Sequence, residues 1–139
     1  MTNLSVNVNK IAWLRNARGE NRPNLIEMSK ILIESGVHGL TVHPRPDLRH
    51  ITPDDVYDLS ILCADNKVEF NIEGNPYSEQ TKIYPGFLNL VKEIMPDQCT
   101  LVPDSPDQLT SDHGWEIQAK DHNAIRNIVE EIQTDKTRV

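Results

Sequence analysis

The segment from His43 to His50, with the sequence HPRPDLRH, holds the side chains of this chain that are best suited to chemistry. Imidazole titrates near neutral pH, so His43 is a candidate for general acid/base catalysis. The planar guanidinium of Arg45 matches a phosphate or a carboxylate. The alternative for His43 is a structural histidine that is hydrogen-bonded at the margin of the sheet. A solvated loop explains each charge of the segment singly, but explains their clustering less easily. The segment therefore favours an anion-binding loop beside a proton-transferring histidine.

Glu73 is a second candidate, because it ends the alternating segment VEFNIE (68–73). A carboxylate at a strand end can point into a site, where burial raises its pKa and suits it to proton transfer. A surface carboxylate at a strand end is the alternative, and this residue taken alone favours that alternative. Basic residues also stand between Asn9 and Gly19, where Arg15 and Arg18 either meet a phosphate or face water.

Ligand types for a metal are present, but their spacing does not indicate a metal site. His43, His50, Glu73 and His113 are not arranged as HxH or HExxH, and the two cysteines form no CxxC. An anion site is therefore favoured over a metal site, and no cofactor is predicted.

Composition narrows the class of protein. The 139 residues suit a single domain (1–139), and a formal net charge of -7 without a basic face argues against nucleic-acid binding. Two cysteines in a chain of this size indicate a reducing compartment. The sequence shows no signal peptide and no apolar run approaching the roughly 18 residues of a membrane helix, so we expect a cytoplasmic protein that does not insert into membranes.

The elements that must position these side chains follow a repeat of strand and helix. Strands are predicted at 4–8, 39–43, 68–73 and 99–102, a period of about 30 residues, which is the length of a βαβ step. A helix is predicted from Asn24, which pairs with Glu27 as a cap, and another from Thr52, an N-cap followed by Pro53 at the first helical position. Apolar spacing predicts two more helices, over 85–95 and around Ile125–Ile132. Parallel strands joined by right-handed crossovers follow from this order.

A barrel fits this repeat better than an open dinucleotide-binding sheet, because nothing like GxGxxG follows the first strand. Polar residues stand at the strand ends, which meet at one mouth in a (β/α)₈ TIM barrel. Such a barrel needs typically about 250 residues, so we expect an α/β half barrel of about four units, truncated after Val139. Its open sheet edges would require another chain or copy.

Four strings, in this order, resemble the pyridoxine 5′-phosphate synthase family. They are VNVNKIAWLRNARG (6–19), GLTVHPRPDLRHIT (39–52), FNIEG (70–74) and TLVPDSPDQLTSDHGW (100–115). The resemblance implies a TIM barrel that condenses 1-deoxy-D-xylulose 5-phosphate with 3-amino-2-oxopropyl phosphate to give pyridoxine 5′-phosphate, phosphate and water. It also implies a cytoplasmic homo-oligomer in which Arg18 reaches a neighbour's site.

Carried over by position, the resemblance implies general acid/base roles for His43 and Glu73. It implies contacts with the deoxyxylulose phosphate for Arg45, His50 and Thr110, and contacts with the amino ketone phosphate for Asn7 and Arg18. Many members have Asp-His where this chain has Asn9-Lys10, and the stretch 75–86 is longer than usual.

The isolated half chain is expected to be inactive, because in the family the second half supplies a further catalytic histidine and phosphate-binding loops. The alternative function is a non-catalytic phosphate-binding or assembly module. A metal-dependent lyase is a weaker third interpretation.

Overall fold

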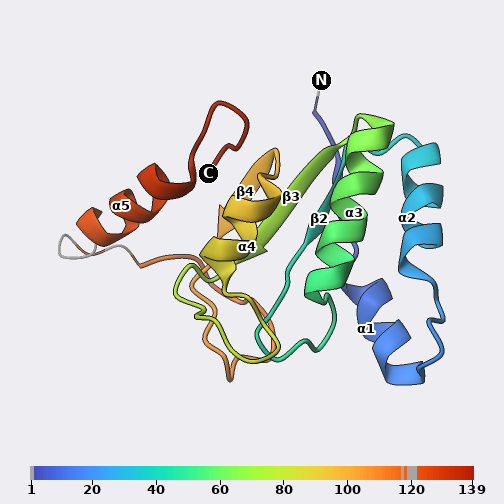
Figure 1. Cartoon of the computed structure of the whole chain (residues 1–139), viewed down its shortest axis with the longest axis horizontal. Helices are drawn as coiled ribbons and strands as arrows, with labels where there is room; N and C mark the ends of the chain where they lie inside the picture. Colours follow the sequence, from blue (N-terminus) through green and yellow to red (C-terminus); the bar gives the residue numbers. More distant parts are fainter. Residues whose placement is uncertain (1, 117, 119–121) are drawn as a thin grey trace.

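A four-stranded parallel sheet organises this computed structural model, which describes residues 2–116, 118 and 122–139 (Figure 1). The strands lie in the order β1-β2-β3-β4, and at least one helix follows each of them. This is the arrangement of half a (β/α)₈ barrel, as the sequence predicts. The strands are β1 (Ser5–Asn7), β2 (Gly39–Val42), β3 (Glu69–Gly74) and β4 (Gln98–Leu101), and the helices are α1 (Asn9–Arg18), α2 (Leu25–Glu34), α3 (Pro53–Asn66), α4 (Phe87–Ile94) and α5 (His122–Ile132).

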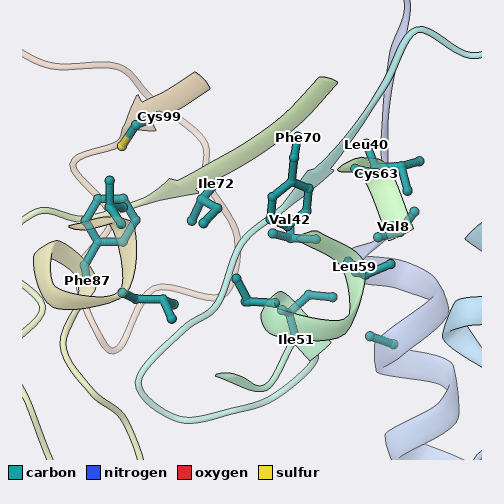
Figure 2. Packing of buried hydrophobic residues seen from close by; sticks show 14 of the residues in the cluster. Val8, Leu40, Val42, Ile51, Leu59, Cys63, Phe70, Ile72, Phe87 and Cys99 are labelled. Carbon is teal, nitrogen blue, oxygen red and sulfur yellow. The ribbon is translucent and has the colours of Figure 1, made fainter. Parts of the chain in front are cut away.

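One face of the sheet forms the hydrophobic core with the helices. Side chains alternate between the two faces of a strand, and in β2 and β3 the apolar set Leu40, Val42 and Ile72 is fully buried. Leu59 of α3 and Phe87 of α4 belong to the same core, which Figure 2 shows from close by. The core therefore lies between the sheet and its helices.

The opposite face of the sheet is polar. Ser5 and Thr41 share a hydrogen bond of 2.8 Å between their hydroxyl groups, the Asn71 amide donates to Thr41 at 3.3 Å, and the Thr100 hydroxyl donates to Asn71 at 3.1 Å. Barrel interiors are usually filled by Val, Ile and Leu. Here a row of hydrogen-bonded polar side chains crosses all four strands instead.

Side-chain caps begin the second and third helices as predicted. Asn24 accepts a hydrogen bond from the Glu27 amide at 3.1 Å. Thr52 and Asp55 form a reciprocal capping box at the start of α3, with Pro53 in the first turn. No helix among the described residues is both long and apolar enough to cross a membrane.

The first βα connection differs from the prediction, which placed no helix between the strand at 4–8 and the helix that begins at Asn24. The structure has a ten-residue helix, α1, that begins at Asn9 and buries Ala12 completely. Most of its residues are strong helix formers, and Gly19 follows with a φ of 75°. The composition could have predicted this helix, but only one of its residues is buried, so the usual apolar periodicity is missing.

A fifth extended segment begins beside β4. Arg138 is paired in parallel with Gln98, and its carbonyl accepts a 2.7 Å hydrogen bond from the Cys99 amide. The Arg138 amide in turn donates to Asp97 at 3.0 Å. This is the position where a fifth barrel strand is expected.

Candidate functional site

A hollow of about 730 Å³ lies at the carboxyl ends of β1, β2 and β3. Six of the seven side chains predicted from the sequence line it, and Arg18 does not. The βα connections leave the sheet at this edge, so the ends of strands that are distant in sequence meet there. The six are Asn7, His43, Arg45, His50, Glu73 and Thr110; the remaining lining residues are Asn9, Lys10, Trp13, Arg49, Leu109 and Ser111.

His43 and Glu73 form the centre of the hollow. Nδ1 of His43 lies 3.8 Å from Oε1 of Glu73, and the same carboxylate oxygen accepts a 3.0 Å hydrogen bond from the Asn7 amide. The Asn7 side chain is itself fixed, because its Oδ1 accepts from the Asn9 backbone N–H at 2.9 Å. The start of α1 thus holds Asn7, and Asn7 holds Glu73.

The surroundings move the pKa values of the pair in opposite directions. The pKa of His43 is lowered to about 4, mainly by burial; Asp104 opposes this shift, Arg45 and Arg49 add to it, and Asp47 has the smallest, opposing effect. Burial and the nearby Asp104 raise the pKa of Glu73. At neutral pH His43 is therefore an uncharged proton acceptor beside a carboxyl group that takes up protons more readily than usual. Such a pair suits stepwise proton transfer.

His50 supports this electrostatic environment from the far end of the same loop. Its ring centroid lies 6.0 Å from that of His43, and its Nδ1 accepts from the Ile51 amide at 2.9 Å. Burial lowers its pKa to about 4, helped by His43 and two arginines. With Nδ1 accepting this hydrogen bond, the neutral ring carries its proton on the other nitrogen, Nε2, which is then a donor.

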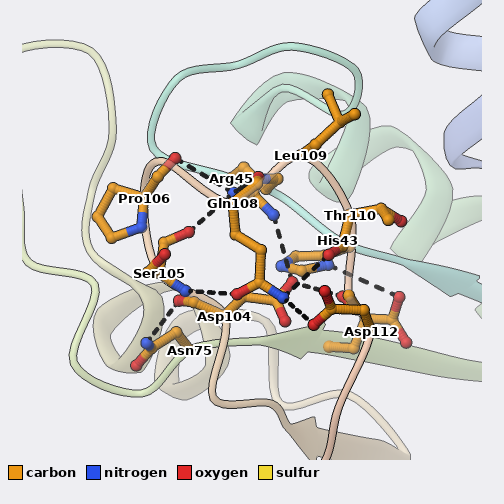
Figure 3. Close-up of polar contacts among 12 residues, drawn as sticks. His43, Arg45, Asn75, Asp104, Ser105, Pro106, Gln108, Leu109, Thr110 and Asp112 are labelled. Atoms are coloured by element: carbon orange, nitrogen blue, oxygen red, sulfur yellow. Dashed lines mark hydrogen bonds and ion pairs between the residues drawn. The ribbon is translucent and has the colours of Figure 1, made fainter.

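Arg45 is buried and holds the segment after β4 in place, as Figure 3 shows. One of its terminal nitrogens lies 3.2 Å from the Asp104 carboxylate. The other donates to the carbonyls of Ser105, Pro106 and Gln108 at 2.9–3.3 Å. Among the described residues, its Nε–H donates to none, so part of the guanidinium stays available to a ligand.

The two arginines of α1 have different surroundings. Arg15, for which the sequence left a phosphate or water as the partner, contacts Asp55 instead, with its NH2 group 2.8 Å from Oδ2. It also donates to the His50 carbonyl at 3.3 Å and so braces the loop behind the hollow. Arg18 is exposed at the last residue of α1, outside the hollow.

Sequence reasoning missed part of the lining. Trp13, Leu109 and Ser111 were not singled out, because apolar and hydroxyl side chains in a loop or on an unrecognised helix carry no motif. Lys10 stands over the Trp13 ring at 5.6 Å from the centroid. Within residues 2–116, 118 and 122–139, no three His, Cys, Asp or Glu side chains come together as metal ligands do.

Known proteins match this chain over almost its whole length. A pyridoxine 5′-phosphate synthase of Xylella fastidiosa (strain 9a5c) is 52% identical over 132 residues, which are 95% of this chain and 50% of that protein. One of Xanthomonas campestris pv. campestris (strain B100) is 51% identical over 138 residues, covering 99% of this chain and 54% of the relative. The chain spans about half the length of these curated relatives. Residues 4–139 match the family described as "Pyridoxal phosphate biosynthesis protein PdxJ", and the chain belongs to that family.

Proposed function

We propose that this chain carries the first part of the active site of a pyridoxine 5′-phosphate synthase. The reaction condenses 1-deoxy-D-xylulose 5-phosphate with 3-amino-2-oxopropyl phosphate and releases phosphate and water. The observation that supports it most is the pair of His43 and Glu73, 3.8 Å apart in a hollow that also receives four of the five predicted substrate-contact residues. Imine formation, dehydration and ring closure each need a proton to move, which suits this pair.

The roles follow from the surroundings of each group. His43, neutral at pH 7, is the proton acceptor, and Glu73, with its raised pKa, is the second acid/base group. Asn7 orients Glu73 and contacts the amino ketone phosphate. Arg45 and His50 offer the donors that remain free, Nε–H of Arg45 and Nε2–H of His50, to the deoxyxylulose phosphate. Thr110 lies exposed in the segment after β4, which lines the hollow, and adds a hydroxyl group.

Lys10 supplies the cation that the buried arginines cannot fully provide. It lies in the first turn of α1, lines the hollow, and makes no ion pair among the residues that the structure describes. A helix N-terminus favours negative charge by about 0.3–1 kcal/mol. A phosphate near Lys10 therefore gains both a point charge and the helix dipole.

Complementation of the chain tests this proposal. The chain is mixed with the second half of the Xylella fastidiosa relative, both substrates are added, and pyridoxine 5′-phosphate is measured by chromatography. We expect product from the mixture and none from either half. In the mixture, His43→Ala and Glu73→Gln should each lower turnover by ~10²-fold or more.

Matched controls in the same mixture are His122→Ala and Glu34→Gln, two exposed residues away from the hollow. Both should leave turnover unchanged. A folded, co-eluting mixture without product, or near-normal turnover of both site variants, would contradict the proposal.

A non-catalytic assembly module is the second candidate, supported by the edge of β1. Among the described residues, β1 pairs only with β2, so its outer edge carries free backbone donors and acceptors. Binding of the second half without any turnover would favour this function.

A further inference from the structure

Asp104 is a buried acid that the proposed reaction does not use. It lies three residues after the end of β4, its side chain is 3% exposed, and it is not among the residues that line the hollow. Its Oδ2 pairs with Arg45 and accepts a short hydrogen bond from the Ser111 hydroxyl. Its Oδ1 is buried and has no hydrogen-bond partner among the described residues. A buried carboxylate with an unpartnered oxygen is costly, so its presence requires an explanation.

The contacts of Asp104 fix both ends of the segment 105–111. At one end, Arg45 is held by Asp104 and donates hydrogen bonds to three backbone carbonyls of the segment. At the other end, the Ser111 hydroxyl donates to the same Asp104 carboxylate. The Asp104 carbonyl also accepts a 2.8 Å hydrogen bond from the Asn75 amide, which ties it to the loop after β3. Since this segment contains no helix or strand, these side-chain contacts determine where its wall of the hollow lies (Figure 3).

The charge of Asp104 also reaches the proton-transferring pair. It raises the pKa of His43 and that of Glu73, whose Oε1 lies 3.8 Å from His43. The other groups that act on His43 are Arg45, Arg49 and Asp47, and the Asn7 amide acts on Glu73 in the opposite direction to Asp104. Removing the Asp104 charge therefore lowers the pKa of both members of the pair.

We propose that Asp104 is a positioning residue of the condensation site: it sets the orientation of Arg45 and the place of Ser111, and it tunes proton transfer at His43 and Glu73 through its charge. This inference rests on the proposed function for the reaction it serves. The geometry gives it two separable effects, one on substrate binding through Arg45 and Ser111, and one on the pH dependence through the charge.

The test compares Asp104→Asn with Asp107→Asn in the complemented mixture. Asp107 is exposed on the same segment, and its side chain makes no hydrogen bond or ion pair among the residues described. We expect Asp104→Asn to raise KM for 1-deoxy-D-xylulose 5-phosphate by about 10-fold, as the loss of one charge-assisted hydrogen bond predicts. The acid limb of its kcat/KM profile should move to lower pH, because both pKa values fall. Asp104→Glu should restore the position of that limb, and Asp107→Asn should change neither quantity.

A measurement without turnover separates this inference from the proposed function. In the 139-residue chain, ¹³C NMR titration of Glu73 should give a lower pKa in Asp104→Asn than in the unchanged chain or in Asp107→Asn. If the unchanged mixture makes no product, the proposed function fails, and this titration still decides the role of Asp104. An unchanged Glu73 pKa, or a KM and pH profile equal to those of Asp107→Asn, would overturn it.

Ser111→Ala keeps the inference testable if Asp104→Asn does not fold. It leaves the charge in place but releases one end of the segment. We expect a raised KM for the deoxyxylulose phosphate with an unmoved acid limb, and an unchanged KM would overturn the positioning role.

Discussion

His43 and His50 are two imidazoles kept uncharged by their place in the fold. Burial lowers the pKa of each to about 4, and the guanidinium groups of Arg45 and Arg49 act in the same direction. A cation at either ring would lie next to other cations in a poorly solvated pocket. The same surroundings that suit His43 for accepting a proton therefore make the loop sensitive to acid.

Stability should fall on acidification between about pH 6.5 and 4. The folded-state pKa of His43 is below the unfolded value of 6.5, so its contribution is complete above pH 6.5 and is lost as the pH falls towards 4. The full shift corresponds to on the order of 3 kcal/mol. Glu73, with a raised pKa, acts oppositely and loses its contribution as the pH rises above its ordinary value. Urea unfolding at pH 7 and pH 5 measures the difference.

His43→Asn should flatten this pH dependence, and His122→Asn, an exposed control, should not. Equal slopes for the unchanged chain and His43→Asn would show that the histidine is not the group responsible.

Lys10 should bind phosphate by charge. Lys10→Met is expected to raise KM for one of the two phosphorylated substrates by about 10-fold in the complemented mixture, because one point charge is removed. Lys10→Arg should keep most of the affinity, and Lys30→Met on the exposed side of α2 is the control. Unchanged KM values for both substrates would exclude a phosphate contact at this residue.

At the scale of elements, an ion pair joins α1 and α3. Both terminal nitrogens of Arg15 reach the two oxygens of Asp55, and each side chain is 13% exposed. Asp55 also completes the cap of α3. Arg15→Met should therefore lower the free energy of unfolding by about 1–3 kcal/mol, measured by urea titration. Arg18→Met, at the exposed end of the same helix, should change it by less than about 0.5 kcal/mol; equal effects would contradict the bracing role.

Gly74 lets α4 approach β3. A Cβ at this position would lie 2.5 Å from a ring carbon of Phe87, which is fully buried and has no room to move. Gly74→Ala should therefore destabilise the chain by about 1–3 kcal/mol through overpacking. A Cβ at Gly114 would meet no atom of the described residues within 4 Å, so Gly114→Ala serves as the control. The double variant Gly74→Ala, Phe87→Leu should recover part of the loss, and no recovery would place the strain elsewhere.

The elements with periodic apolar residues or caps could be predicted from the sequence. Asn24 and Thr52 are capping residue types directly before α2 and α3, and they predict where these helices begin. The alternation of apolar and polar residues around Phe70 and Ile72 predicts β3. Helix α1 could not be predicted in the same way, because only Ala12 of this helix is buried in the core, and several of its other residues face the hollow, the solvent or Asp55. The role of Arg15 stayed open for a related reason: its partner is 40 residues away, and no local pattern connects the two.

At the scale of the whole molecule, the half barrel leaves strand edges for another chain. β1 is paired on one side only within the described residues, and β4 is flanked by a short segment at Arg138. We expect the isolated chain to self-associate in sedimentation velocity experiments, and the second half of a relative to convert these species into a one-to-one complex. A 15.8 kDa monomer at all concentrations would contradict association through the edges.

The barrel type and the clustering of strand ends could be predicted from the 30-residue period and the polar residues that close each strand. The network around Asp104 could not, because Arg45 and Asp104 are 59 positions apart and only the fold brings them together. Resemblance supplied the roles of single residues, whereas the hydrogen bonds that hold those residues come from the three-dimensional arrangement alone.

The hydrogen-bonded polar row on the inner face of the sheet affects how strongly molecular chaperones would bind the newly synthesised chain. Molecular chaperones select exposed apolar surface, and an unfinished barrel with a Val, Ile and Leu interior would offer it freely. Ser5, Thr41, Asn71 and Thr100 present amides and hydroxyls there instead. With this face of the sheet uncovered, the chain therefore offers chaperones little apolar surface there, and its apolar core is buried between the sheet and the helices.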